Sequence, residues 1–253
     1  IIVRKDTTTV LKDLEFIKIE AAMNLFKASI AILLSSSSNA VVALTATTSQ
    51  SSSGGVFTGL QTTPLIRASD ALPTIITQQW RQETPFAIAD ETVGIAFLRH
   101  FGWFLCWEHA RELRDVVLPA IPSGKLFFVG IGSALAVQEF ASNLDLDPTL
   151  CFADEGGMAG EVLGLGKGFK TMWNPAAIDT MMGRNDEESL KALGESYKAA
   201  IDKVGFQKLA PPNMMDTFRQ GGTFVFKGNN LLLEHYDEKV GDNCSIDDIL
   251  KVL

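Results

Sequence analysis

Cysteine is scarce in this chain of 253 residues. The three cysteines, Cys106, Cys151 and Cys244, lie far apart, so the chain lacks both the density of a disulfide scaffold and the paired spacing of a zinc site. No Cys-x-x-Cys pair is present. Cys106-x-x-His109 is half of a metal-binding pattern, and no second half accompanies it. We therefore expect no metal ion and no disulfide framework.

Basic residues are also few. Lys and Arg number 22 against 30 Asp and Glu, which gives a formal net charge of −8. This balance argues against a surface for nucleic acid or for an anionic membrane. A hydrophobic content of 46% is ordinary for a globular protein. The length suits one domain of moderate size with appendages.

Nucleotide-binding motifs are incomplete. The run Gly130–Leu135 follows a predicted strand, but Leu135 stands where G-x-G-x-x-G requires its third glycine. Gly164–Gly168 contains a lysine but lacks the Walker spacing. Neither Ser133 nor any of the three histidines has the context of a nucleophile elbow. We expect no cofactor.

The N-terminal part is typical of a processing signal that begins at Met23. A short apolar stretch, Ala28–Leu34, is followed by serines and by small residues suited to cleavage at Val41–Ala43. It is too short to span a bilayer, so the mature form would hold no membrane segment. Residues 1–22 precede this signal as upstream sequence. Residues 44–62 are rich in hydroxyl side chains, which predicts a disordered linker.

Two interpretations of this part remain open. A processed signal would direct the protein to the secretory pathway or a plastid. A plain N-terminal linker would carry no targeting signal and leave the protein in the cytoplasm. We expect residues 1–65 to comprise these segments and residues 66–253 to form the folded domain, with an irregular insertion at about 164–220.

Short apolar runs alternate with helical patterns across the folded domain. Strands are expected over 93–98, 126–131 and 150–153. Helices are expected over 106–120, 134–144, 158–163 and 186–204. A hairpin over 223–226 and 231–235 and a helix over 245–252 close the chain. This order predicts an α/β fold: a mixed central sheet with helices on both faces and a C-terminal β-hairpin plus helix.

Two sequence blocks sharpen this interpretation. The first is Phe97-Leu98-Arg99-His100-Phe101-Gly102, followed by Cys106 and Ala110-Arg111-Glu112-Leu113; the second is Gln220–Val225 with Leu233-Glu234-His235 and Gly241-Asp242. They resemble the AhpC/TSA-type peroxiredoxin-like family of the thioredoxin superfamily, which includes the prostamide/prostaglandin F synthase-like proteins. The resemblance covers residues 66–253. It implies a thioredoxin-like fold and a thiol-dependent reductase or antioxidant activity.

The resemblance also implies where the chemistry should lie. Members of the family carry a Cys-x-x-Cys pair at a strand-to-helix turn, where backbone N–H groups and the helix dipole stabilise a thiolate. Here Cys106 occupies the second position and Trp103 replaces the attacking cysteine. With Arg99 just upstream, these three are the candidate catalytic residues. A thiol reductant and a small peroxide or disulfide are the expected partners; the oligomeric state stays open.

The helical phase of Cys106 indicates a structural role instead. Cys106, Ala110, Leu113 and Val117 form one apolar stripe, and a thiol buried on it has a raised pKa. Cys151 is expected inside a strand. Cys244 lies in a polar turn and is expected to be exposed, so a Cys106–Cys244 disulfide would require the C-terminal segment to move.

Two functions follow from these alternatives. The first is a thioredoxin-fold redox protein weakened by the loss of its attacking cysteine. The second is a non-catalytic binding module, in which Trp103, Phe104 and Trp107 turn the former active-site lip into an apolar contact surface. The two tryptophans lie one turn apart and are expected on a helix face away from the stripe.

Overall fold

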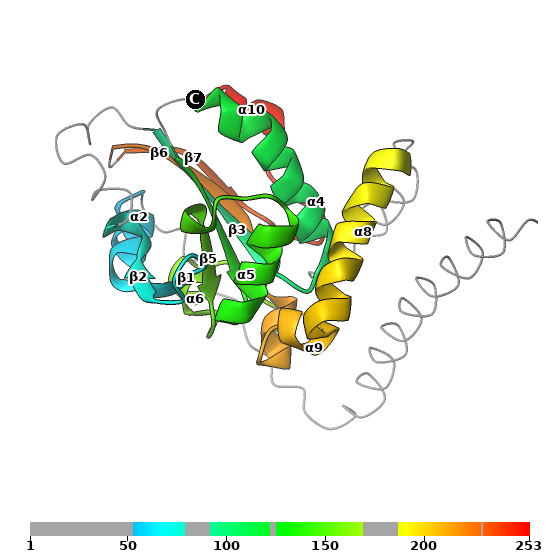
Figure 1. Ribbon diagram of the computed structural model, residues 1–253. Helices are drawn as coiled ribbons and strands as arrows, with labels where there is room; N and C mark the ends of the chain where they lie inside the picture. The colour runs from blue at the N-terminus through cyan, green and yellow to red at the C-terminus, as the bar shows by residue number, and fades with distance from the viewer. Residues whose placement is uncertain (1–52, 79–91, 122–124, 169–186, 229) are drawn as a thin grey trace, which may run out of the picture. The chain divides into compact units, whose positions relative to one another are not determined.

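The computed structural model describes residues 53–78, 92–121, 125–168, 187–228 and 230–253 (Figure 1). A mixed sheet of seven strands, in the order β2-β1-β5-β4-β3-β6-β7, forms its centre. The strands are β1 (Pro64–Arg67), β2 (Pro73–Ile75), β3 (Thr92–His100), β4 (Lys125–Ile131), β5 (Cys151–Asp154), β6 (Gly222–Lys227) and β7 (Asn230–Tyr236). The central strands β3, β4 and β5 run parallel, and β6 and β7 continue the sheet in antiparallel register.

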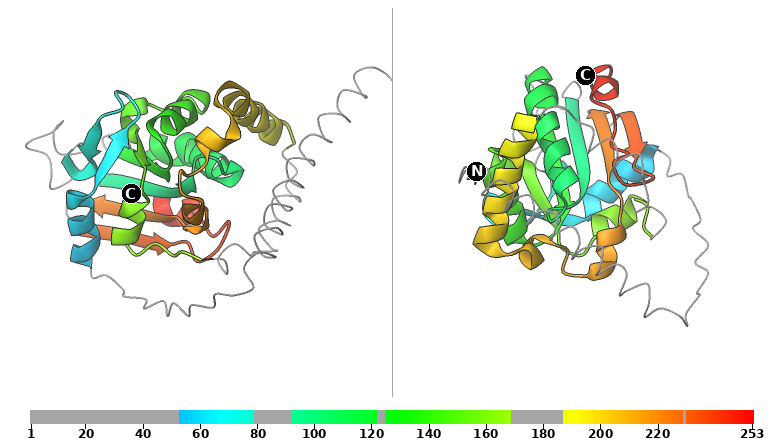
Figure 2. Two further views of the ribbon diagram at one scale, coloured as in Figure 1. Left: turned by 90° about the horizontal axis from the view of Figure 1, so that it is seen from below. Right: turned by 90° about the vertical axis from the view of Figure 1, so that its right-hand side faces the viewer.

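Helices cover both faces of this sheet. They are α2 (Ser53–Thr62), α4 (Phe104–Glu112), α5 (Ala134–Asn143), α6 (Met158–Val162), α8 (Glu187–Val204), α9 (Phe206–Leu209) and α10 (Ile246–Leu250). The first face packs against α4, α5, α8 and α10, and the second against α2 and α6. The turned views of Figure 2 show α4 and α8 side by side on the first face. The predicted thioredoxin-like α/β architecture is confirmed.

The central strands form because their side chains are apolar on both sides. In β3, Ala96 and Leu98 point into the first cluster, and Ile95 and Phe97 into the second. Strands buried on both faces appear in a sequence as continuous apolar runs rather than alternating ones. The predicted strands 93–98, 126–131 and 150–153 correspond to β3, β4 and β5.

The helix predicted over 106–120 begins earlier and is less regular than expected. Residues Phe104–Glu112 are α-helical, Leu113–Val117 form a π-helical turn, and Leu118–Ala120 form a 3-10 turn. Pro119 has no backbone N–H to continue the α-helical ladder, so the helix changes its hydrogen bonding before it ends.

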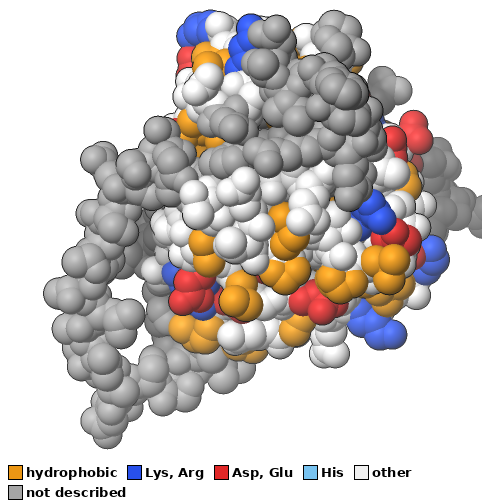
Figure 3. Space-filling model, turned by 90° about the vertical axis from the view of Figure 1, so that its left-hand side faces the viewer, with side chains coloured by type: hydrophobic (Ala, Val, Ile, Leu, Met, Phe, Trp, Pro, Cys, Tyr) orange, Lys and Arg blue, Asp and Glu red, His pale blue; other side chains and the backbone are white. Residues whose placement is uncertain are grey.

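The disordered linker predicted to reach residue 62 is wrong at its C-terminal end. Residues 53–62 form α2, and Leu60 is buried in the second cluster. A Cβ atom at Gly59 would lie 2.7 Å from Val162 Cγ1, so the glycine lets α2 approach α6 closely. Figure 3 shows this side of the molecule, where hydrophobic side chains lie among charged ones. The predicted signal segment and residues 1–22 lie outside the described residues.

The region predicted as an irregular insertion, about 164–220, contributes to the core. Residues 169–186 lie outside the described part. From 187 onward the segment forms α8, α9 and a 3-10 turn at Met214–Phe218, and buries Leu193, Ala200 and Leu209 in the first cluster.

None of the described helices is both long and apolar enough to cross a membrane.

Candidate functional site

The candidate site lies where β3 turns into α4. The register of β3 with β4 shifts between Leu98 and His100, an irregularity that redirects the side chain between them. The backbone N–H of Trp103 then donates to His100 O (3.2 Å), and that of Cys106 donates to Trp103 O (3.0 Å). The strand therefore passes into the helix through a tight, internally bonded turn.

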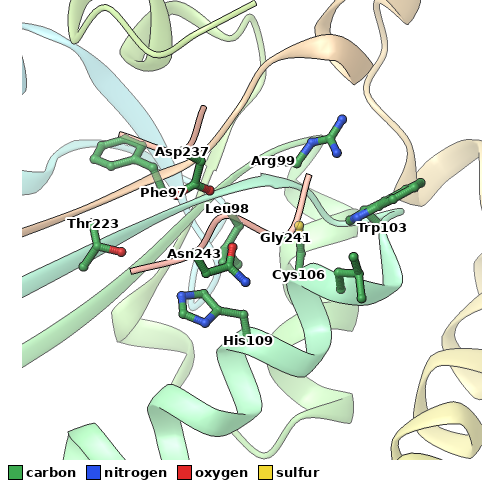
Figure 4. Close-up of a pocket in the computed structure, with 11 residues that line it drawn as sticks. Phe97, Leu98, Arg99, Trp103, Cys106, His109, Thr223, Asp237, Gly241 and Asn243 are labelled. Atoms are coloured by element: carbon green, nitrogen blue, oxygen red, sulfur yellow. The ribbon is translucent and has the colours of Figure 1, made fainter. Parts of the chain in front are cut away.

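A pocket opens beside this turn (Figure 4). It brings together side chains from β3, the turn, α4, β6 and the loop after β7. Its lining is Phe97, Leu98, Arg99, Trp103, Leu105, Cys106, His109, Thr223, Asp237, Gly241 and Asn243. The three residues singled out from the sequence, Arg99, Trp103 and Cys106, thus meet in one place.

Cys106 is buried beneath this pocket with 6% of its surface exposed. Burial raises the pKa of its thiol to about 11, although the backbone N–H of His100 and the charge of Arg99 oppose that rise. The apolar stripe predicted for Cys106, Ala110, Leu113 and Val117 is confirmed, since all four are buried. At neutral pH the sulfur is therefore protonated.

Arg99 supplies the positive charge of the site. Its Nη2 donates to Thr217 O (2.8 Å) and its Nε to Arg219 O (3.3 Å). Thr217 lies in the 3-10 turn, and Arg219 follows that turn directly. The segment before β6 therefore fixes the guanidinium. Burial lowers the pKa of Arg99, and the neighbouring Cys106 and Asp237 work against that effect.

Trp103 closes the site on the outer side. It stands at the N-cap position of α4, makes no side-chain cap and is partly exposed. Its ring lies 5.1 Å from the Arg99 guanidinium carbon and 6.2 Å from the His100 ring centroid. The geometry is that of a cation–π contact that covers the guanidinium.

Trp107 does not belong to this outer surface, contrary to the sequence interpretation. It is fully buried, packs against Phe140 and Tyr197, and its Nε1 donates to Phe101 O (2.7 Å). Helix α4 lies between the sheet and α8, so two of its faces are buried. The local sequence does not reveal the face that α8 covers. Of the three aromatic residues expected to form an apolar lip, Trp103 and Phe104 are partly exposed and Trp107 is not.

The loop after β7 adds residues that the sequence reasoning missed. Asp237 is buried in the pocket wall, and its Oδ1 lies 3.4 Å from His235 Nε2. His235 Nε2 also lies 2.7 Å from Asp242 O, and its pKa is raised to about 9, chiefly by Asp237. A polar residue directly after a hairpin was the signal that could have drawn attention to Asp237.

Gly221 allows this wall to form. A Cβ atom there would lie 2.2 Å from Phe97 O and 2.7 Å from Asp237 Oδ2. Its carbonyl accepts a hydrogen bond from the Asp237 backbone N–H (3.1 Å). Only glycine permits this approach of β3, β6 and the loop.

The two histidines near Cys106 are both buried and neutral. Burial lowers the pKa of His109 to about 4 and that of His100 to about 3. The ring nitrogens of His100 make no hydrogen bond with any residue that the structure describes. Neither imidazole ring is positively charged at neutral pH.

No group of three or more potential metal ligands occurs in the described part of the chain.

The remaining cysteines are buried and unbridged. Cys151 lies inside β5, as expected. The expected exposure of Cys244 is wrong: only 5% of its surface is exposed, and burial raises its pKa to about 11. Its polar neighbours face outward while its own side chain joins the first cluster.

Comparison with known proteins agrees with this fold. A family model described as AhpC/TSA antioxidant enzyme matches residues 113–239, just over half of the chain. The matched part runs from the end of the α4 region through β4, β5 and the closing hairpin, and it starts after the turn that holds Trp103 and Cys106. No curated protein matches the chain. On its fold and this match, the chain belongs to the AhpC/TSA antioxidant enzyme family.

Proposed function

We propose that this protein is a thiol redox protein of the one-cysteine type, in which Cys106 is the reacting sulfur. The observation that carries the proposal is the position of Cys106 at the β3–α4 turn, in a pocket shared with Arg99. Within the family, the block around Phe97–Leu113 resembles the prostamide/prostaglandin F synthase-like proteins. Trp103 stands where those proteins have the attacking cysteine.

The chemistry requires a thiol from outside the chain. With a peroxide, the Cys106 thiolate attacks one oxygen, the O–O bond breaks, and a sulfenic acid forms as water or an alcohol leaves. An external dithiol then displaces water to form a mixed disulfide, and its second thiol releases Cys106. Cys151 and Cys244 are buried, so neither is placed to take over this second role.

The expected activity is weak. With a thiol pKa of about 11, only about one molecule in ten thousand carries a thiolate at pH 7. The charge of Arg99 favours the thiolate, but burial outweighs it. Turnover should therefore increase with pH, as the thiolate fraction increases.

A turnover assay with peroxide or a small disulfide and an external dithiol tests this proposal. Cys106→Ser should abolish the activity. Trp103→Cys restores a sulfur at the start of α4 and should increase the rate on the order of a hundredfold, because a cysteine there has a lowered pKa. Activity that persists in Cys106→Ser would contradict the proposal.

A binding module is the second candidate, and the burial of Cys106 favours it. Trp103 and Phe104 are both partly exposed beside the pocket, and they offer an apolar contact surface of the kind that aromatic side chains form at interfaces. This alternative predicts no turnover with any thiol donor and loss of binding in Trp103→Ala. Thiol adducts trapped by the wild type but not by Cys106→Ser would argue against it.

A further inference from the structure

Two aromatic side chains hold the carbonyl groups of the turn before Cys106. Trp107 Nε1 donates to Phe101 O (2.7 Å), and Tyr197 Oη donates to Gly102 O (2.8 Å). The first donor belongs to α4 itself. The second comes from α8, which follows in the sequence 95 residues after the turn. The region expected to be an insertion therefore reaches the candidate site directly.

The ring of Tyr197 also packs against α4 on both sides of Cys106. Its centroid lies 5.6 Å from that of Phe104 and 5.2 Å from that of Trp107, both in edge-to-face geometry. Aromatic pairs in this arrangement stabilise beyond the area they bury. Tyr197 is thus attached to the turn by its hydroxyl and to the first turns of α4 by its ring.

The same segment packs closely against the turn at Gly102. A Cβ atom at Gly102 would lie 3.1 Å from the Ala210 Cα and backbone N, which directly follow α9. Gly102 is itself buried. Cys106 lines the pocket beside this turn with only 6% of its surface exposed, so a shift of the turn changes how readily its sulfur meets a reagent.

We propose that Tyr197 is a positioning residue: its hydrogen bond to Gly102 O holds the Phe101–Trp103 turn in place and sets how readily Cys106 reaches solvent. We call this hydrogen bond the latch. The proposal rests on the proposed function only in taking Cys106 as the reacting group. Loss of the hydroxyl leaves the buried Gly102 carbonyl without its side-chain donor, which favours local opening of the turn.

Cysteine alkylation on the intact chain tests the latch. Tyr197→Phe keeps the ring contacts and removes the hydroxyl alone. Under native conditions with iodoacetamide, and with mass spectrometry resolving each cysteine, the rate at Cys106 should increase about tenfold. Cys151 lies in the central sheet and should label at an unchanged rate. The midpoint of the Cys106 pH profile should also fall below about 11, because burial is what raises that pKa.

Tyr236→Phe is the matched control, because Tyr236 is the chain's only other tyrosine. Its hydroxyl donates to Glu234 Oε1 (2.6 Å) on the exposed side of the hairpin, so its removal should leave Cys106 labelling unchanged. An equal increase at all three cysteines, or no increase at Cys106 in Tyr197→Phe, would overturn the latch. Selective labelling of Cys106 without turnover in either protein would support the latch and overturn the proposed function.

Discussion

At the scale of single residues, His235 links the hairpin to the loop that walls the pocket. Asp237 raises its pKa to about 9, and the Asp242 carbonyl adds to this effect. A group with a raised pKa binds its proton more tightly in the folded state. Its stabilisation is therefore fully present below a pH of about 6.5, the ordinary histidine pKa, and is lost as the pH rises through about 9.

His235→Gln should accordingly lower the free energy of unfolding by about 1 kcal/mol or less at pH 6, because solvent screens this partly exposed pair. Above pH 10 the variant and the wild type should be equally stable. Urea denaturation at the two pH values measures the difference. The same loss at both values would show that the side chain acts by packing and not by charge.

Residue roles could be predicted only where they depend on local sequence. The burial of Cys106 follows from a helical period that is visible within twelve residues. The burial of Cys244 and the role of Asp237 depend on which strand and helix the C-terminal loop meets. Polar neighbours indicated exposure for Cys244, but its cluster partners are distant in the sequence.

At the scale of elements, α8 contains a glycine with no packing role. A Cβ atom at Gly194 would meet nothing within 4 Å. Alanine has a higher helix propensity than glycine and restricts the unfolded chain more. Gly194→Ala should therefore raise the free energy of unfolding by about 0.5–1 kcal/mol, measured by chemical denaturation.

Gly221→Ala provides the contrast for that measurement. The same added methyl would lie 2.2 Å from Phe97 O, and the strands would have to separate, which should cost roughly 3 kcal/mol or more. A destabilised Gly194→Ala would mean that α8 needs the glycine for a contact or for its backbone conformation. A neutral Gly221→Ala would contradict the close approach of β3 and β6.

Elements could be predicted where pattern and turn chemistry agree. The strands β3 and β4 are continuous apolar runs, and a Lys-Gly-Asn-Asn turn marks the hairpin. The helix α2 was missed because its residues have the composition of a linker, and one buried leucine with one close-packed glycine decides its place. Tyr197 was missed because its partner Gly102 lies 95 residues away.

At the scale of the whole molecule, the two buried histidines beside the turn should make the fold sensitive to acid. Burial lowers the pKa of His100 to about 3 and that of His109 to about 4. The unfolded chain binds protons at these rings from about pH 6.5 downward, whereas the folded chain does not. Stability should therefore be lost as the pH falls through this range.

The slope of that loss is the measurable quantity. Each histidine should contribute up to about 1.4 kcal/mol per pH unit between its unfolded and folded pKa values. His109→Gln should cost stability at pH 7 but flatten the decline between pH 6 and pH 4, as followed by urea midpoints. Titrating carboxylates act equally in both proteins, so the difference between the two curves isolates the histidine. An unchanged slope in the variant would mean that His109 binds its proton equally well in the folded chain, in contradiction to its burial on α4 beside the pocket.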